Sequence, residues 1–136
     1  MGRIMAFDYG IKTTGIAVTD TENIISIGLT SIETKNILIF IKKYLQCNNV
    51  SRFLIGIPNG KRNFFVILKI QNFILKLTNL YKEIKIHTID ENFTTKIANQ
   101  YIINNKKFYK KKNCVYENEI SAIIMLKEWL KYYNKI

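Results

Sequence analysis

The chain has 136 residues, and 21 basic against 10 acidic side chains give it a formal net charge of +11. This length predicts one domain over residues 1–136, and 48% hydrophobic with 23% charged residues excludes a disordered chain. Its two cysteines, Cys47 and Cys114, form no metal-binding cluster, which indicates free thiols in a reducing compartment. No segment resembles a secretion signal or a membrane span, so we expect a cytoplasmic protein with no membrane partner.

The first part of the chain has short apolar segments separated by turn residues, which predicts strands at residues 3–9, 15–19 and 23–30. Residues 31–34 read as a helix entry. Helical and extended patterns then alternate. They predict helices at 36–45, 64–81, 93–104 and 119–133, strands at 52–57 and 84–89, and a basic loop at 105–116.

This order of elements predicts an α/β fold. We expect a mixed five-stranded sheet whose first three strands are antiparallel, flanked by helices on both faces. No internal repeat and no linker divides the chain.

Acidic residues follow two of the predicted strands. Asp8 ends the first strand, and Asp90 and Glu91 follow the last one. Asp8 at a turn and the other two at a helix start are also common capping positions, so capping is an alternative interpretation. Carboxylates that meet at the carboxyl ends of strands are what Mg²⁺ or Mn²⁺ needs for chemistry on phosphodiesters.

Four segments together resemble the YqgF/RuvX family of RNase H-like proteins, which are described as Holliday junction resolvases and as nucleases that process pre-16S ribosomal RNA. Residues 7–18 contain FDYGIK and GIAV, which are similar to the family's opening motif, DxGxKxxGxAV. Residues 54–58 (LIGIP), 90–95 (DENFTT) and 120–126 (ISAIIML) resemble three further family motifs in the same order. The resemblance extends over essentially the whole chain.

The resemblance implies a catalytic set of Asp8, Glu91 and Asn118, with Mg²⁺ or Mn²⁺ bound by Asp8, Asp90, Glu91 and Glu117. It also implies an RNase H-like fold and a role in ribosome biogenesis.

Two polar positions depart from the family pattern: Asn118 stands where an Asp is expected and Asn92 where an Arg is expected. An Asn carbonyl oxygen can bind Mg²⁺ but brings no negative charge. Glu117 can supply the missing charge, whereas Glu119 is turned away by one helical step of about 100°.

We therefore predict a metal-dependent endonuclease that processes the 5′ end of pre-16S ribosomal RNA. Two alternatives stay open. One is a catalytically weakened or inactive relative that binds nucleic acid or the ribosome. The other is a Holliday junction resolvase-like nuclease acting on branched DNA.

Lysines and aromatic residues alternate in the predicted basic loop, and such a pattern suits a nucleic-acid backbone with stacked bases. A solvated loop enriched in Lys by AT-rich codon usage is the alternative. The predicted nucleic-acid contacts are Lys12, Lys106, Lys107, Lys110, Lys111 and Lys112. His87 is interpreted as a core or edge residue, and the chain as a monomer or a homodimer.

Overall fold

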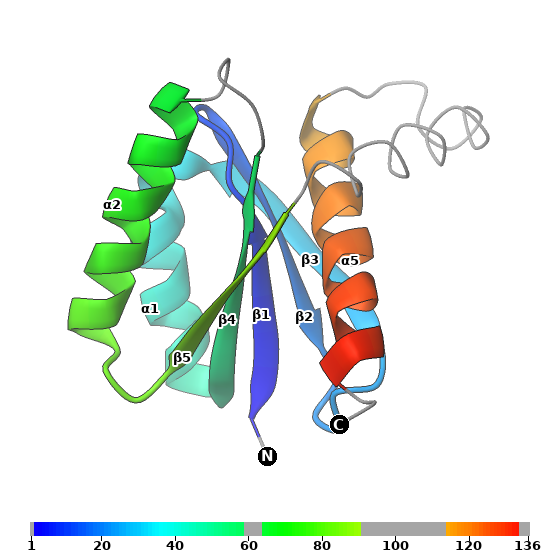
Figure 1. Cartoon of the computed structure of the whole chain (residues 1–136). Coiled ribbons are helices and arrows are strands. Elements are labelled where there is room, and N and C mark those ends of the chain that lie inside the picture. Colours follow the sequence, from blue (N-terminus) through cyan, green and yellow to red (C-terminus); the bar gives the residue numbers. More distant parts are fainter. Residues whose placement is uncertain (1, 59–63, 91–113, 134–136) are drawn as a thin grey trace.

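The computed structural model describes residues 2–58, 64–90 and 114–133, with the side chains of the last segment described from Glu119 onward. Figure 1 shows one twisted sheet with helices on both sides. Its strands are β1 (Arg3–Asp8), β2 (Thr13–Thr19), β3 (Ser26–Glu33), β4 (Val50–Ile57) and β5 (Lys85–Asp90), in the order β3-β2-β1-β4-β5. The first three strands pair antiparallel, and β1, β4 and β5 pair parallel. The predicted mixed sheet is confirmed.

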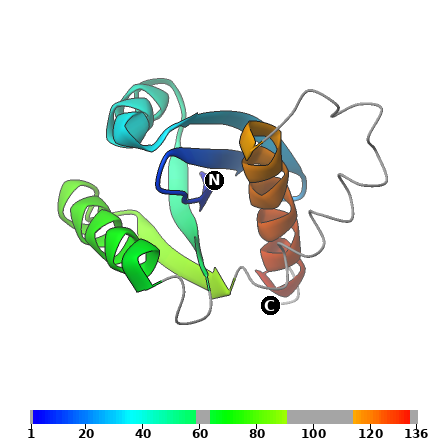
Figure 2. The same cartoon turned by 90° about the horizontal axis from the view of Figure 1, so that it is seen from above.

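Helices lie on both faces of the sheet, as Figure 2 shows from above. They are the short η1 (Thr34–Asn36), α1 (Ile37–Cys47), α2 (Phe64–Leu80) and α5 (Cys114–Tyr133). One face is covered by α1 and α2. The opposite face is covered by α5, which packs across β1, β2 and β3. No helix in the described ranges is long and apolar enough to cross a membrane.

The sequence of β1 explains how one strand serves both layers. Successive side chains of a strand point to opposite faces. Met5 and Phe7 are buried in the core beneath α1 and α2, whereas Ile4 and Ala6 are buried beneath α5.

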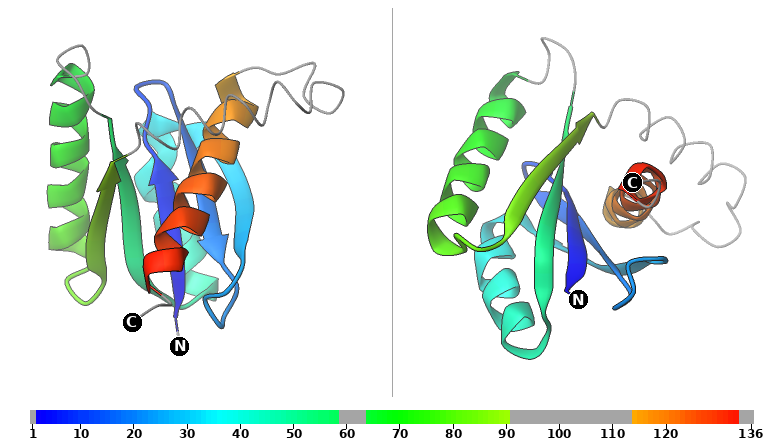
Figure 3. Two further views of the ribbon diagram at one scale, coloured as in Figure 1. Left: turned by 45° about the vertical axis from the view of Figure 1, so that its right-hand side comes forward. Right: turned by 60° about the horizontal axis from the view of Figure 1, so that its bottom comes forward.

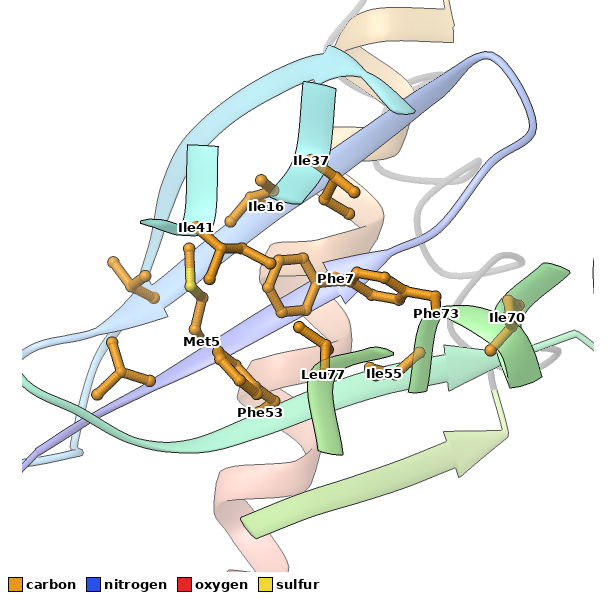
Figure 4. Close-up of a cluster of buried hydrophobic side chains, with 12 residues drawn as sticks. Met5, Phe7, Ile16, Ile37, Ile41, Phe53, Ile55, Ile70, Phe73 and Leu77 are labelled. Carbon is orange, nitrogen blue, oxygen red and sulfur yellow. The ribbon is translucent and has the colours of Figure 1, made fainter. Parts of the chain in front are cut away.

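Aromatic rings dominate the core on the α1 and α2 side (Figure 4). Phe7 lies between Phe53 and Phe73, with ring centroids 5.7 and 5.5 Å away. Ile41 from α1 and Leu77 from α2 are fully buried in the same cluster. The burial of these apolar side chains stabilises the packing of both helices on the sheet.

The core on the α5 side is built from smaller side chains. Ala6, Ala17 and Ala122 are completely buried there, together with Met125 and Leu126 of α5. Small residues let a helix approach a sheet closely, so α5 lies near the backbone of β1 and β2.

The third strand differs from the prediction of residues 23–30. It begins at Ser26 and continues to Glu33, so the expected helix entry at 31–34 is mostly strand. The reason is pairing, because β2 holds β3 in register as far as Thr13 and Glu33. Asn23 lies in the preceding turn with φ of 59°, a conformation that Asn adopts more readily than most residues.

The last helix begins earlier than predicted, at Cys114 and not at residue 119. The end of the predicted basic loop, residues 114–116, is therefore helical. Residues 114–118 contain no Pro or Gly, so nothing in this segment prevents the helix from beginning before residue 119. The predicted helix at 93–104 and the remainder of the basic loop lie outside the described residues.

Candidate active site

Asp8 is the last residue of β1, which is the central strand of the sheet, and it pairs with Gly15 of β2. Its side chain is only 7% exposed. By the alternation of β1 it points to the same face as Ala6, which is the face covered by α5. A carboxylate at such a position needs hydrogen bonds or a cation to offset its lost hydration. Asp8 therefore has the placement expected of a metal ligand.

The loop that follows Asp8 is fastened to the start of η1. The Thr34 hydroxyl donates to the carbonyl oxygen of Gly10 at 2.6 Å, and the Thr14 hydroxyl lies 2.8 Å from the Thr34 hydroxyl. The backbone N–H of Thr34 donates to the carbonyl oxygen of Lys12 at 2.9 Å. These bonds fix the backbone beside Asp8 and hold the exposed Lys12 close to that edge of the sheet.

Asp90 ends β5 at the same edge, but the structure does not bring it together with Asp8. The register pairs Asp90 with Ile57, and Ile57 packs into the core beneath α1 and α2. Asp90 therefore points to the face opposite Asp8, and its side chain is exposed. Its predicted metal role remains a prediction without support from this geometry.

The other predicted site residues belong to parts of the chain that are only partly described. Glu91 and the lysines at 106, 107, 110, 111 and 112 lie outside the described residues. Asn118 and Glu117 lie in the first turns of α5, where the backbone alone is described. Figure 3 shows that α5 begins at the end of the sheet where β1 ends. The fold thus brings the start of α5 and the end of β1 to the same edge.

Glu119 is the first residue of α5 whose side chain is described, and it packs over β3. A Cβ atom added to Gly28 of β3 would lie 2.7 Å from Glu119 Oε1. Gly28 is paired with Ala17, two residues along β2 from the partner of Asp8. This placement agrees with the prediction that Glu119 is turned away from the site.

Among the described residues, no three His, Cys, Asp or Glu side chains lie close enough together to hold a metal ion. Asp8 is buried at the end of β1, and its role as a metal ligand stays a prediction. Carboxylate oxygen is the donor that Mg²⁺ and Mn²⁺ prefer, so its chemistry fits either ion.

His87 lies away from Asp8, between Arg52 of β4 and Trp129 of α5. Its Nε2 accepts a hydrogen bond from Arg52 Nη1 at 2.8 Å, and its ring centroid is 5.1 Å from that of Trp129. Burial lowers the pKa of His87, and the positive charges of Arg52 and Lys85 lower it further. These contacts favour a structural role over that of a general base, as the sequence suggested.

Several polar residues line a pocket between α1 and α2. The sequence did not predict a site at these residues. Three of them, Lys69, Asn72 and Lys76, lie on α2 at spacings of three and four residues. This spacing places them on one face of the helix, and it is the sequence signal that could have found them.

The model of one family, RuvX, described as a Holliday junction resolvase, matches residues 2–132. The chain belongs to the RuvX family. The match covers every described strand and almost all of α5, including Asp8 and position 118.

Curated relatives are similar over nearly their full length. A protein of Karelsulcia muelleri is 36% identical over 97% of this chain and 100% of its own. Proteins of Flavobacterium psychrophilum and Porphyromonas gingivalis are 39% and 37% identical, over 96% of this chain and 97% and 96% of their own. All three carry the name "Putative pre-16S rRNA nuclease".

Two solved structures share the fold. The RuvC protein of T. thermophilus, in complex with a Holliday junction substrate, aligns with a TM-score of 0.62 over 99% of this chain and 97% of its own, at 8% identity. The fowlpox virus Holliday junction resolvase aligns with a TM-score of 0.59 over 96% of this chain and 99% of its own, at 16% identity. These likenesses establish the RNase H-like architecture of the chain.

Proposed function

We propose that this protein is a metal-dependent endonuclease that cleaves structured RNA at the 5′ end of pre-16S ribosomal RNA. The observation that carries the proposal is the buried Asp8 at the carboxyl end of β1, in a chain that belongs to a nuclease family. The names of the relatives supply the choice of substrate. Such RNA processing belongs to ribosome biogenesis.

In this proposal Asp8, Glu91 and Asn118 would hold Mg²⁺ or Mn²⁺ at the edge of the sheet. Such an ion would supply a water molecule of lowered pKa and would stabilise the leaving oxygen. Lys12 contacts a phosphate beside the loop that the Thr34 hydrogen bonds fix in place. Gly10 leaves room for the nucleic-acid backbone to approach Asp8.

We choose Glu91 over Asp90 as the second ligand. The strand register turns Asp90 to the face opposite Asp8, and successive side chains of an extended chain point to opposite faces. Glu91 lies outside the described residues, and its choice rests on the resemblance of residues 90–95 to the family motif.

Asn118 lies in the first turns of α5, at the edge where β1 ends. Its amide oxygen is a neutral ligand, so the site carries one negative charge less than a site with three carboxylates. We expect Asn118→Asp to increase metal affinity and the cleavage rate at limiting Mg²⁺. If Glu117 already supplies the missing charge, Glu117→Gln reduces the rate more than Asn118→Ala does.

The decisive experiment compares the wild-type protein with Asp8→Asn, which keeps the shape of the side chain and removes its charge. Cleavage of a 5′-extended 16S precursor RNA is measured with Mg²⁺ and with Mn²⁺. We expect Asp8→Asn to lose at least about 100-fold in rate, because metal-ion catalysis supplies several kcal/mol of barrier reduction. Circular dichroism confirms that both proteins are folded. Equal cleavage by the two proteins, or none by the wild type, contradicts the proposal.

A DNA-cleaving function is the second candidate, and the description of the matching family model favours it. A four-way DNA junction is therefore included in the same assay. Cleavage of the junction at a rate above that of the precursor RNA assigns the protein to branched DNA. Binding of either nucleic acid without cleavage in any metal identifies the non-catalytic relative, for which the substitution at position 118 provides a reason.

A further inference from the structure

A pocket of about 340 Å³ lies between α1, α2 and the loop after β1. It opens on the face of the sheet opposite Asp8, since α1 and α2 cover that face. We call it the basic pocket. Its lining residues come from three parts of the sequence and are Tyr9, Ile11, Thr34, Lys35, Ile37, Leu38, Lys69, Asn72, Phe73 and Lys76.

The charge of the basic pocket is positive. Lys35, Lys69 and Lys76 contribute to its wall, and no carboxylate of the described residues lines it. Lys35 forms an exposed ion pair with Glu33 at 3.2 Å. Within the described part of the chain, Lys69 and Lys76 have no ion-pair partner, and both ammonium groups are available to an anion. Lys69 is held over the ring of Phe65, with Nζ 5.3 Å from the centroid.

The floor of the basic pocket is apolar and aromatic. The ring centroids of Tyr9 and Phe73 lie 5.4 Å apart, and Ile37 and Leu38 line the same pocket. The Tyr9 side chain lines the pocket and offers a hydroxyl that can donate a hydrogen bond. The Asn72 amide adds a second neutral donor to the wall.

A pocket lined by both ammonium groups and aromatic rings matches a ligand that has both an anionic part and a flat apolar part. The volume lies at the low end of the range for small-molecule sites, so it admits one nucleotide and excludes a duplex. We propose that the basic pocket binds one nucleotide unit, with its phosphate between Lys69 and Lys76 and its base against the Tyr9 and Phe73 rings. The anion site stands on the structure alone, whereas the choice of a nucleotide rests on the proposed nuclease function.

The position of the pocket relates nucleotide binding to the proposed active site. Tyr9 directly follows Asp8, and the two side chains leave the strand end on opposite faces. An unpaired nucleotide held in the basic pocket would anchor a bound strand beside the edge at which Asp8 lies. The same chemistry suits a free nucleotide, and the experiment separates these two sources.

Binding of uridine 5′-monophosphate, uridine and inorganic phosphate is measured by calorimetry on the full chain. The test variant is Lys69→Gln with Lys76→Gln. The control is Lys42→Gln with Lys43→Gln, which removes the same charge from exposed positions of α1 that do not line the pocket. We expect the nucleotide to bind more tightly than phosphate or uridine. The test variant should lose at least about tenfold in nucleotide affinity, and the control should match the wild type.

A wild type that does not bind the nucleotide, or equal loss in the test and control variants, overturns the proposal. A short single-stranded RNA identifies the source of the ligand. Weaker RNA binding by the test variant assigns the pocket to the RNA strand, and unchanged RNA binding with lost nucleotide binding assigns it to a free nucleotide. Asp8→Asn should keep nucleotide binding while it loses cleavage, so a failed nuclease assay and a failed pocket are distinguishable.

Discussion

The two faces of the sheet are built on different principles. Beneath α1 and α2, large aromatic rings fill the space between the layers, and the ring of Phe7 contacts those of both Phe53 and Phe73. Beneath α5, alanines line the contact, and a Cβ atom at Gly28 would lie 2.7 Å from the side-chain ends of Glu119 and Ile123, which would have to shift. One core is rich in aromatic rings, and the other combines three alanines with aliphatic side chains.

The two faces therefore contribute differently to the stability of the fold and to the proposed chemistry. The aromatic face holds the protein together through buried area. The alanine face lets α5 lie against β1 and β2, which brings the start of that helix to the edge where Asp8 ends β1. In the proposed mechanism, a carboxylate at this edge would share a metal ion with a residue of α5.

The largest effect is expected from a deletion on the aromatic face. Phe53 is fully buried and contacts the rings of Phe7 and Tyr81. Phe53→Ala should lower the free energy of unfolding by about 3–5 kcal/mol, because it removes buried area and leaves a cavity. Urea denaturation measures this loss, and Phe64→Ala serves as the control because Phe64 is 66% exposed. A loss no larger than that of the control would show that this core is not the main source of stability.

A smaller effect is expected from an insertion on the alanine face. Ala122 is completely buried between α5 and the sheet, so Ala122→Leu should cost about 1–3 kcal/mol by overpacking. It should also reduce cleavage, because it displaces the start of α5 from Asp8. Lys127→Leu adds the same side chain at an exposed position of the helix and should leave both properties nearly unchanged. Cleavage at the wild-type rate by a well-folded Ala122→Leu protein would contradict the close-approach explanation.

The smallest effect is a pH dependence at the far end of the α5 face, where His87 accepts a hydrogen bond from Arg52. The pKa of His87 is lower in the folded protein, so below about pH 6.5 the unfolded chain binds the proton more readily. Stability should therefore fall as the pH drops from about 6.5 towards the folded-state pKa.

His87→Gln replaces the Nε2 acceptor with an amide oxygen that can accept from Arg52, and it removes the titration. The difference in denaturation midpoint between pH 7.5 and pH 5 should be smaller in this variant than in the wild type. An unchanged difference would show that other groups cause the acid sensitivity.

The local pattern of β1 was enough to predict Asp8 at a strand end, because alternation of buried side chains is a property of a few consecutive residues. The apolar periods of α1, α2 and α5 likewise predicted their existence. The pattern failed at Ser31, which the sequence suggested as a helix entry, because the pairing of β3 with β2 is made between distant residues. It also failed at the start of α5, which begins at Cys114 and not at residue 119.

The sequence by itself determined the kinds of elements, their order, the buried carboxylate at the end of β1 and the membership of the RuvX family. Only the tertiary structure decided that Asp90 faces away from Asp8, and that Lys35, Lys69 and Lys76 surround one pocket. The physical reason is the range of the interactions. Strand alternation and helix period are set by neighbouring residues, whereas register and helix packing depend on contacts between segments that are far apart in the chain.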